Sequence, residues 1–267
     1  MKKAELAEVQ EMIYGIFVEF DRICQKYEIK YSMEGGTLLG AVKYSDFVPW
    51  DDDIDVLMLR SEYEKFMKVA PKELQEDYCL QSYQTVPEFP LNYAKLCYRK
   101  SLICNYSYSH LKQMNHGVFI DIFPIDWVRP DRLNGQLHIV GLLTGARRTK
   151  LKIDMGNIPR LKHLCYRVVA MLPMRTLCRL MDVACTWYNG HETGYCYEVC
   201  NSNRNFKPLP SEFYHNVTTL KFRRGEYMAV ERYHEFLQSR FGKDYLQELP
   251  PSEQRKPSHD RNILLER

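Results

Sequence analysis

Apolar residues recur at helical spacing over residues 4–28, which predicts an amphipathic helix. Beyond it, short apolar runs rich in β-forming residues alternate with glycine-bearing turns, a pattern typical of strands. The predicted strands cover residues 30–34, 54–59, 78–83, 94–98, 102–105, 118–123 and 218–222. A short helix is expected over residues 37–42 with Thr37 near its N-cap. Ser61 and Glu64 form a capping-box pattern that predicts a helix ending near Leu74.

Helical spacing returns over residues 131–190, where Gly156, Pro159 and Pro173 divide the pattern into three expected helices. A last helix is expected from Glu226 to about Phe241, followed by a polar, proline-punctuated tail. These patterns predict an α+β protein in which a mixed β-sheet is flanked by helices. The predicted organisation is a core in residues 1–130, a basic helical insertion at 131–190, and a return to the core with a C-terminal helix and tail at 191–267.

The composition is that of an ordinary globular protein, with 45% hydrophobic and 27% charged residues among 267, which excludes disordered and collagen-like classes. No run approaches the roughly 20 apolar residues that a membrane span needs. Met1-Lys2-Lys3 leads directly into a charged amphipathic stretch rather than an apolar signal peptide. The nine cysteines are therefore expected to be reduced thiols of a cytoplasmic protein.

The net charge of +3 conceals one basic segment, Arg147 to Arg179, which holds nine lysines and arginines and one acid, Asp154. A solvated helical face is the default interpretation of this segment. Because the charges alternate with leucine, isoleucine, valine and methionine, an anionic membrane or a lipid-linked glycan is the alternative partner. The protein would then lie at the inner face of the membrane. Nucleic acid is not expected, since the motifs that read it are missing.

Four acids lie within five positions, Asp51, Asp52, Asp53 and Asp55, directly before an apolar strand. Side chains two residues apart on a strand share a face, so Asp53 and Asp55 are expected to project together, whereas Asp51 can sit in the preceding turn. Carboxylates this close repel one another unless a cation lies between them, and hard oxygen ligands suit Mg²⁺ or Mn²⁺. Asp121 offers a third carboxylate inside a later apolar run.

Gly35, Gly36 and Thr37 open the short helix that precedes these acids. Glycine lets the backbone approach a phosphate closely, and a helix N-terminus presents free N–H groups to it. Either motif alone would be an ordinary turn, but their joint spacing favours metal-dependent transfer at phosphorus.

Together, these motifs resemble the LicD family, bacterial relatives of the fukutin-type transferases with a nucleotidyltransferase fold. The residues that carry the resemblance are Gly35–Val42, Phe47–Val56, Arg60, Tyr63 and Phe119–Asp126. Weaker matches follow near the C-terminus, at Tyr233, Phe236, Leu237, Phe241, Gly242, Leu249–Pro251, Arg255 and His259. Residues 131–214 carry no match. Where the family has Arg-His-Lys-Gly, this chain has Lys43-Tyr44-Ser45-Asp46, a departure that leaves donor and acceptor identity open.

The resemblance implies that a phosphoalcohol, most often phosphocholine, passes from a CDP-activated donor such as CDP-choline to a sugar hydroxyl of a cell-surface glycan or its precursor. Asp53 and Asp55 would hold Mg²⁺ with Asp121 as the third acid, and Asp121 would also accept the hydroxyl proton. Two alternatives remain: nucleotidyl transfer that releases pyrophosphate, and a non-catalytic protein of the same fold that binds glycan or lipid.

Further candidates have weaker signals. Lys43 and Lys95 are expected to bind phosphate, with Arg99 a weaker candidate. Trp50, Tyr106 and Tyr108 are candidate rings for an alcohol headgroup such as choline, through cation–π contact.

His110 and His116 could act as ligands or bases, although a lone histidine usually does neither. Cys178, Cys185, Cys196 and Cys200, with His191 between them, have at best weak zinc spacing. We expect packed thiols there and no zinc.

Overall fold

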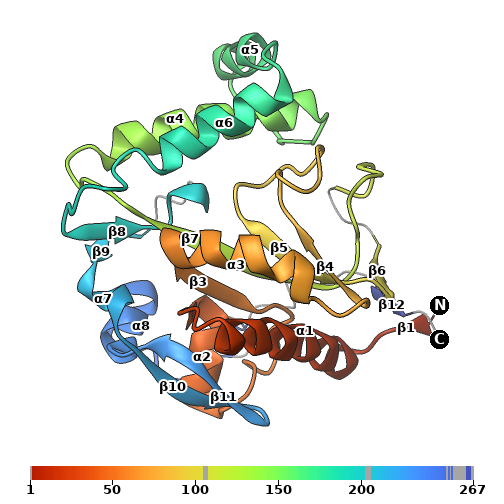
Figure 1. Ribbon diagram of the computed structural model, residues 1–267, viewed down its shortest axis with the longest axis vertical. Helices are drawn as coiled ribbons and strands as arrows, with labels where there is room; N and C mark the ends of the chain where they lie inside the picture. Colours follow the sequence, from red (N-terminus) through yellow and green to blue (C-terminus); the bar gives the residue numbers. More distant parts are fainter. Residues whose placement is uncertain are drawn as a thin grey trace.

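The computed structural model describes residues 2–104, 108–201 and 206–250, together with residues 252, 254 and 263–265. Its centre is a seven-stranded mixed sheet with the order β2-β3-β7-β5-β4, which β8 and β9 extend beside β7 (Figure 1). The strands are β2 (Ser32–Met33), β3 (Asp55–Leu59), β4 (Tyr78–Gln81), β5 (Ala94–Tyr98), β7 (Phe119–Trp127), β8 (Tyr195–Tyr197) and β9 (Leu209–Pro210). Only β3 and β7 pair in parallel within this sheet. The expected α+β class is confirmed.

Helices α1 (Leu6–Lys26) and α3 (Arg60–Glu73) pack on one face of the sheet (Figure 1). The apolar stripe of α1 is buried, as its spacing predicts. Arg60, in the first turn of α3, makes a bidentate pair with Asp126 of β7, with N···O distances of 2.8 and 2.6 Å. Both side chains are almost fully buried, so this pair fixes α3 against the sheet.

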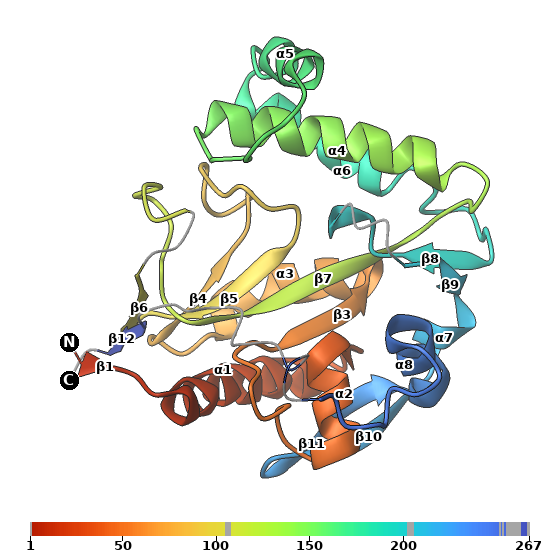
Figure 2. The same cartoon turned by 180° about the vertical axis from the view of Figure 1, so that it is seen from behind.

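A helix-and-hairpin layer closes one end of the sheet (Figure 2). It contains α2 (Gly35–Tyr44), α7 (Glu212–His215), α8 (Tyr233–Phe241) and the hairpin of β10 (Val217–Phe222) and β11 (Gly225–Val230). At the opposite side, β1 (Lys2–Lys3), β12 (Ile263–Leu265) and β6 (Ser101–Ile103) form a small sheet where the two ends of the chain meet. A short 3₁₀ turn, η1 (Val199–Asn201), follows β8.

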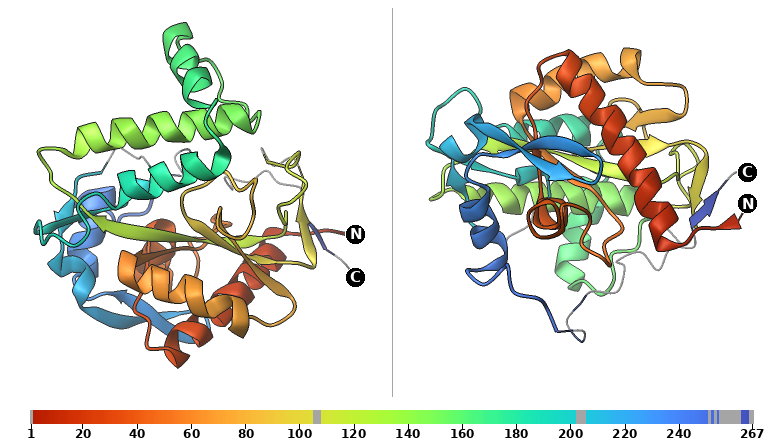
Figure 3. Two further views of the ribbon diagram at one scale, coloured as in Figure 1. Left: turned by 45° about the horizontal axis from the view of Figure 1, so that its top comes forward. Right: turned by 90° about the horizontal axis from the view of Figure 1, so that it is seen from below.

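The insertion consists of α4 (Leu133–Lys150), α5 (Arg160–Val169) and α6 (Met174–Cys185), which confirms the three expected helices. They form a separate layer, with α5 outermost (Figures 1 and 3). Arg147 of α4 is fully buried and donates to the carbonyl of Phe89 at 2.5 Å, which ties this layer to the core. Asp182 of α6 accepts a hydrogen bond from the Tyr83 hydroxyl of the loop after β4. In the described residues, no helix is long and apolar enough to cross a bilayer.

Two expected helix starts are wrong. α2 begins at Gly35 with Glu34 as its N-cap, so the glycines lie inside the first turn and Thr37 is not the cap. α3 begins at Arg60 after Leu59, so Ser61 does not cap it. In both cases contacts from distant parts of the chain set the helix start. The Glu34 N–H donates to Asp55, and Arg60 is held by Asp126.

The helix expected from Glu226 is also wrong over its first turns. Residues 225–230 form β11, and the helix α8 begins only at Tyr233. The hairpin turn holds Arg223 at a positive φ of 52°, and its guanidinium pairs with Asp46 at 2.8 Å. The Val230 N–H donates to the Ser32 hydroxyl, so tertiary contacts stabilise a strand where helical spacing favours a helix.

Candidate active site

Three charged side chains form one row across the centre of the sheet. The parallel register places Asp55 of β3 beside Asp121 of β7, and the antiparallel register places Lys95 of β5 on the other side of Asp121. Asp126 lies five residues beyond Asp121 on the same strand and faces α3, so Asp121 faces the opposite side of the sheet. Lys95 is buried, and its Nζ donates to Asp121 Oδ1 at 2.5 Å. The sequence predicts separate roles for Lys95 and Asp121, and their ion pair appears only in the structure.

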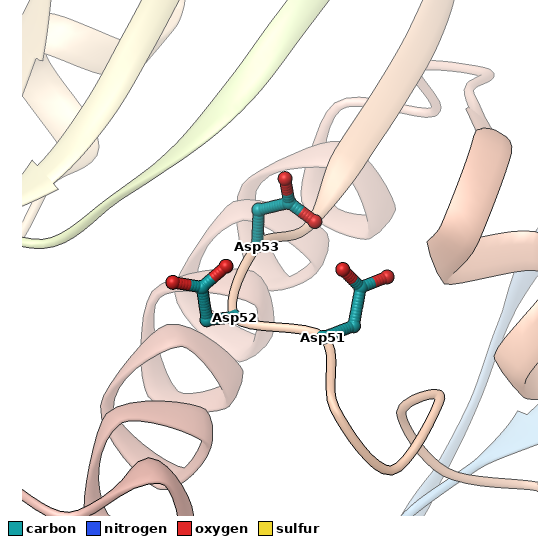
Figure 4. Close-up of side chains that lie close together, drawn as sticks. All are labelled: Asp51, Asp52 and Asp53. Atoms are coloured by element: carbon teal, nitrogen blue, oxygen red, sulfur yellow. The ribbon is translucent and has the colours of Figure 1, made fainter. Parts of the chain in front are cut away.

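Asp51, Asp52 and Asp53 occupy the loop that leads into β3 (Figure 4). β3 begins only at Asp55, so Asp53 does not share a strand with it as expected. Asp53 instead converges with its two predecessors, and one ligand oxygen from each of the three lies within 4.8 Å of the others. The ligands predicted from the sequence include Asp53 but neither Asp51 nor Asp52, whereas the structure groups all three.

The loop acids and the row on the sheet share one electrostatic environment. Burial, reinforced by the charge and hydrogen bond of Asp53, raises the pKa of Asp51 to about 8. Burial raises the pKa of Asp55 well above its ordinary value, and the charges of Asp53 and Asp121 add to this shift. Burial and repulsion between neighbouring acids both disfavour the charged carboxylates, so an added positive charge would stabilise them. Clustered hard oxygens in this state suit a divalent cation such as Mg²⁺ or Mn²⁺.

The first turn of α2 positions these acids. The Thr37 hydroxyl accepts the Asp55 N–H at 3.0 Å, so Thr37 fixes the start of β3. A Cβ atom on Gly36 would lie 2.2 Å from Asp51 Oδ2, which means that only glycine leaves room for this carboxylate. The close approach brings Asp51 to the positive end of the helix, where anions are stabilised. Gly35 adopts a positive φ of 52°.

A second group of buried charges adjoins the row and was missed by sequence analysis. Glu34, the N-cap of α2, pairs with Arg240 of α8 at 3.0 Å. Burial and the charge of Glu34 raise the pKa of Glu198 to about 8, although Arg240 acts in the opposite direction. Both glutamates also raise the pKa of Asp55. Among the described residues, Glu34 Oε2 and Glu198 Oε1 are buried without a hydrogen-bond partner, so both oxygens can still accept a donor or a cation.

Glu34 could have been noticed because it directly precedes Gly35. Glu198 and Arg240 carry no local signal, since only the fold brings the residue that follows β8 and the helix α8 together here.

A cavity of about 440 Å³ lies between α4 and the start of β5. Tyr93, Tyr108 and Tyr166 contribute rings to its lining. Lys95 Nζ lies 5.6 Å from the centre of the Tyr93 ring, so the cavity adjoins the charged row. Arg148 also lines the cavity, and its buried Nε has no hydrogen-bond partner among the described residues. Tyr108 is the predicted ring found here, whereas Tyr93 and Tyr166 were not predicted. Tyr106 lies outside the described residues.

Trp50 and Lys43 line a different cavity, of about 450 Å³, against the C-terminal segment. Lys43 Nζ donates to the Gln247 carbonyl at 3.0 Å and lies 3.4 Å from Glu248. It belongs to the last turn of α2, about 12 Å along the helix from Gly35 at a rise of 1.5 Å per residue. The structure therefore does not bring the predicted phosphate ligands Lys43 and Lys95 together, nor Trp50 and Tyr108.

The weaker candidates lie elsewhere. His110 and His116 each contact a backbone carbonyl, and Arg99 donates to the Tyr78 carbonyl beside β4. The thiols of Cys178, Cys185, Cys196 and Cys200 are free and buried. Within the described ranges, the ligand atoms that converge as a possible metal site are those of Asp51, Asp52 and Asp53.

Residues 28–138 match the LicD/FKTN/FKRP nucleotidyltransferase domain. This segment contains the α2 N-terminus, the aspartate loop of Asp51, Asp52 and Asp53, and the whole charged row, so the predicted resemblance to the LicD family is confirmed. Over 97% of both chains, the protein is 28% identical to the lipopolysaccharide cholinephosphotransferase LicD of Haemophilus influenzae. An uncharacterized protein of Rickettsia typhi is 30% identical over 29% of this chain and 26% of its own. A second, from Rickettsia prowazekii, is 32% identical over a quarter of each chain.

Proposed function

We propose that this protein transfers a phosphoalcohol, phosphocholine above all, from a CDP-activated donor to a sugar hydroxyl of a cell-surface glycan or its precursor. The observation that carries the proposal is the row of Asp55, Asp121 and Lys95 beside the aspartate loop. It lies in a chain similar over nearly its full length to a lipopolysaccharide cholinephosphotransferase. A glycan acceptor and a phosphocholine donor follow from that similarity.

The residues present fit a divalent metal. Asp53 and Asp55 would hold Mg²⁺ or Mn²⁺ with Asp121 as the third acid, and Asp51 and Asp52 converge with Asp53 in the adjoining loop. Burial and neighbouring acids raise the pKa values of Asp51 and Asp55, and a cation would offset both effects. When bound, the metal would supply positive charge to the diphosphate oxygens of the donor. The N–H groups of the first turn of α2 would face the same phosphates.

Other side chains of the site would accept the proton and bind the two substrates. Asp121 would accept the proton of the attacking hydroxyl, and its ion pair with Lys95 supports this role because it holds the carboxylate in position. The tyrosine-lined cavity next to Lys95 offers aromatic faces to a trimethylammonium headgroup. Arg148 offers an unsatisfied donor to a charged or hydroxylated part of either substrate.

The test is an assay of the purified protein with CDP-choline, Mg²⁺ and lipopolysaccharide or its sugar precursor. We expect CMP and a phosphocholine-bearing glycan as products. Pyrophosphate release from a nucleoside triphosphate would instead indicate nucleotidyl transfer, and no metal-dependent turnover would indicate a binding protein.

Asp53→Asn, Asp55→Asn and Asp121→Asn should each abolish CMP release. Asp77→Asn, which alters a surface pair with Lys100, is the matched control and should leave it unchanged.

A further inference from the structure

Helix α5 presents a nearly bare surface. Of its ten residues, Arg160–Val169, only Tyr166 is buried. Tyr166 packs into a site in α4 where a Cβ on Gly145 would lie 2.3 Å from the ring. Val169 and Ala170, at the C-terminal end of the helix, also pack against the core. In Figures 1 and 3, α5 stands at the extremity of the molecule.

The outward face of α5 is apolar. At 100° per residue, Leu161, Leu164, Cys165 and Val168 fall on one side of the helix, opposite Tyr166. Leu161 is 74% exposed, Leu164 56% and Val168 59%. Met171, just beyond the helix, is 82% exposed. Soluble surfaces carry single exposed apolar residues routinely, but a contiguous set on a protruding helix indicates a partner.

Basic residues flank this apolar face on both sides. Lys162 lies on one side of the helix, and Arg160 and Arg167 lie on the other. The exposed basic residues of the segment are Lys150, Lys152, Arg160, Lys162, Arg167, Arg175 and Arg179, against the single acid Asp154. An apolar stripe between two cationic edges matches the profile of an anionic bilayer, with acyl chains below and negative headgroups beside them.

Two basic residues of the segment are not available for contact with a membrane. Arg147 is fully buried and bound to the core, and Arg148 lines the tyrosine cavity, so neither belongs to an exposed basic face. The membrane contact expected from the whole segment narrows to α5 and its immediate flanks.

We propose that α5 is an interfacial membrane anchor that binds anionic lipid surfaces through Leu161, Leu164, Val168 and Met171, with Lys162 and Arg167 among its headgroup contacts. Tyr166 lies on the opposite side of the same helix and lines the tyrosine cavity. The anchor therefore brings that cavity to the bilayer surface. If the proposed transfer reaction holds, a lipid-linked glycan would reach the row of Asp55, Asp121 and Lys95 from the bilayer surface.

Cys165 provides a probe, because it is the one exposed thiol of the nine and lies on the apolar face. We would label it with an environment-sensitive fluorophore and titrate the protein with vesicles of phosphatidylcholine, with or without phosphatidylglycerol. The expected result is a blue shift with anionic vesicles that weakens as salt is raised, since surface attraction is screened. Sedimentation of the unlabelled protein with the same vesicles checks that the label does not create the binding.

Two double variants separate the apolar contribution to vesicle binding from the electrostatic one. Leu164→Ser with Met171→Ser should weaken vesicle binding at least tenfold at any salt concentration. Lys162→Glu with Arg167→Glu should weaken it at least tenfold at low salt only. Matched controls are Val18→Ser with Leu246→Ser, exposed apolar residues elsewhere, and Lys68→Glu with Lys72→Glu on α3. Both controls should bind as the unaltered protein does.

The proposal is overturned if the protein ignores anionic vesicles or if the α5 variants bind them as well as the controls do. It is also overturned if the apolar face instead joins two copies of the chain. In that case, sedimentation velocity without lipid would show a dimer that Leu164→Ser with Met171→Ser dissociates. Because these side chains are exposed, circular dichroism should show unchanged folding. Vesicle binding and sedimentation do not depend on the transfer reaction, so these tests remain valid if the proposed function is wrong.

Discussion

At the scale of single residues, the site depends on close steric fit between the backbone and the acidic side chains. Gly36 is the clearest case. A methyl group there would occupy the position of the Asp51 carboxylate, 2.2 Å away. The motif Gly-Gly could be recognised from the sequence as a phosphate-binding feature, but its steric relation to Asp51 could not. Fifteen residues separate the two, and only the fold brings them into contact.

We therefore expect Gly36→Ala to displace Asp51 and to reduce CMP release by more than tenfold, with little loss of helix. Gly135→Ala in α4 is the control, because its added methyl meets open space and should change activity by less than twofold. Steady-state assays of CMP release by both variants would test this expectation. Full activity in Gly36→Ala would mean that the Asp51 position is unimportant.

Lys95 and Asp121 are expected to stabilise the fold only as a pair. Removing one partner of a buried ion pair leaves an uncompensated charge, which costs about 3 kcal/mol, whereas removing both costs less. Lys95→Met and Asp121→Asn should each lower the free energy of unfolding, and the double variant should lower it by less than the sum. Urea unfolding in a double-mutant cycle measures this coupling. The exposed Lys100–Asp77 pair should contribute under about 1 kcal/mol in the same test.

Glu198 gives a pH prediction. Its pKa rises from the ordinary 4.5 to about 8 in the folded protein. A raised pKa means that the folded state holds its proton more tightly, so stability from this group is lost as pH rises towards 8. From about pH 6 to about pH 9, the chelator-treated protein should lose roughly 2 kcal/mol that Glu198→Gln does not lose. Urea unfolding of both proteins at the two pH values tests this, and parallel losses would contradict it.

At the scale of secondary-structure elements, predictions from sequence held where local pattern decides and failed where distant contacts do. The stripe of α1 and the apolar strands β5 and β7 follow from spacing alone. β11 does not, because its residues have helical spacing and become a strand through the Arg223 turn and the Ser32 contact. The same distinction applies to the site. Asp55 and Asp121 stand out in their own strands, whereas Glu198 and Arg240 meet only through tertiary structure.

Arg147 is one of the buried side chains that join the insertion to the core. Arg147 donates to the Phe89 and Asn92 oxygens, and within the described part of the chain its hydrogen bonds include none to a carboxylate. Arg147→Met should leave these acceptors unsatisfied and destabilise the protein by roughly 2 kcal/mol. Limited proteolysis should then cut residues 151–159 faster. Arg179→Met, at an exposed site on α6, is the control and should change neither stability nor proteolysis.

At the scale of the whole molecule, three layers meet at one place. The sheet supplies the charged row, and the α2 and α8 layer supplies the helix N-terminus and the Glu34–Arg240 pair. The insertion supplies one wall of the tyrosine cavity, including Tyr166. No layer contains the full set, so the site forms only when all three pack. Because burial and mutual repulsion both disfavour the charged forms of Asp51 and Asp55, a bound cation would stabilise this arrangement.

Mg²⁺ or Mn²⁺ should therefore stabilise the entire fold. A ligand that binds only the folded state raises stability by mass action, so about 2.7 kcal/mol is expected at a metal concentration one hundred times its Kd. The rise in Tm should be larger near pH 8.5 than near pH 6.5, because Asp51, with a pKa of about 8, must lose its proton to bind a cation. Differential scanning calorimetry with and without chelator measures both effects. Asp53→Asn should remove most of the metal-dependent rise and Asp77→Asn none. A rise that survives in Asp53→Asn would place the metal elsewhere in the protein.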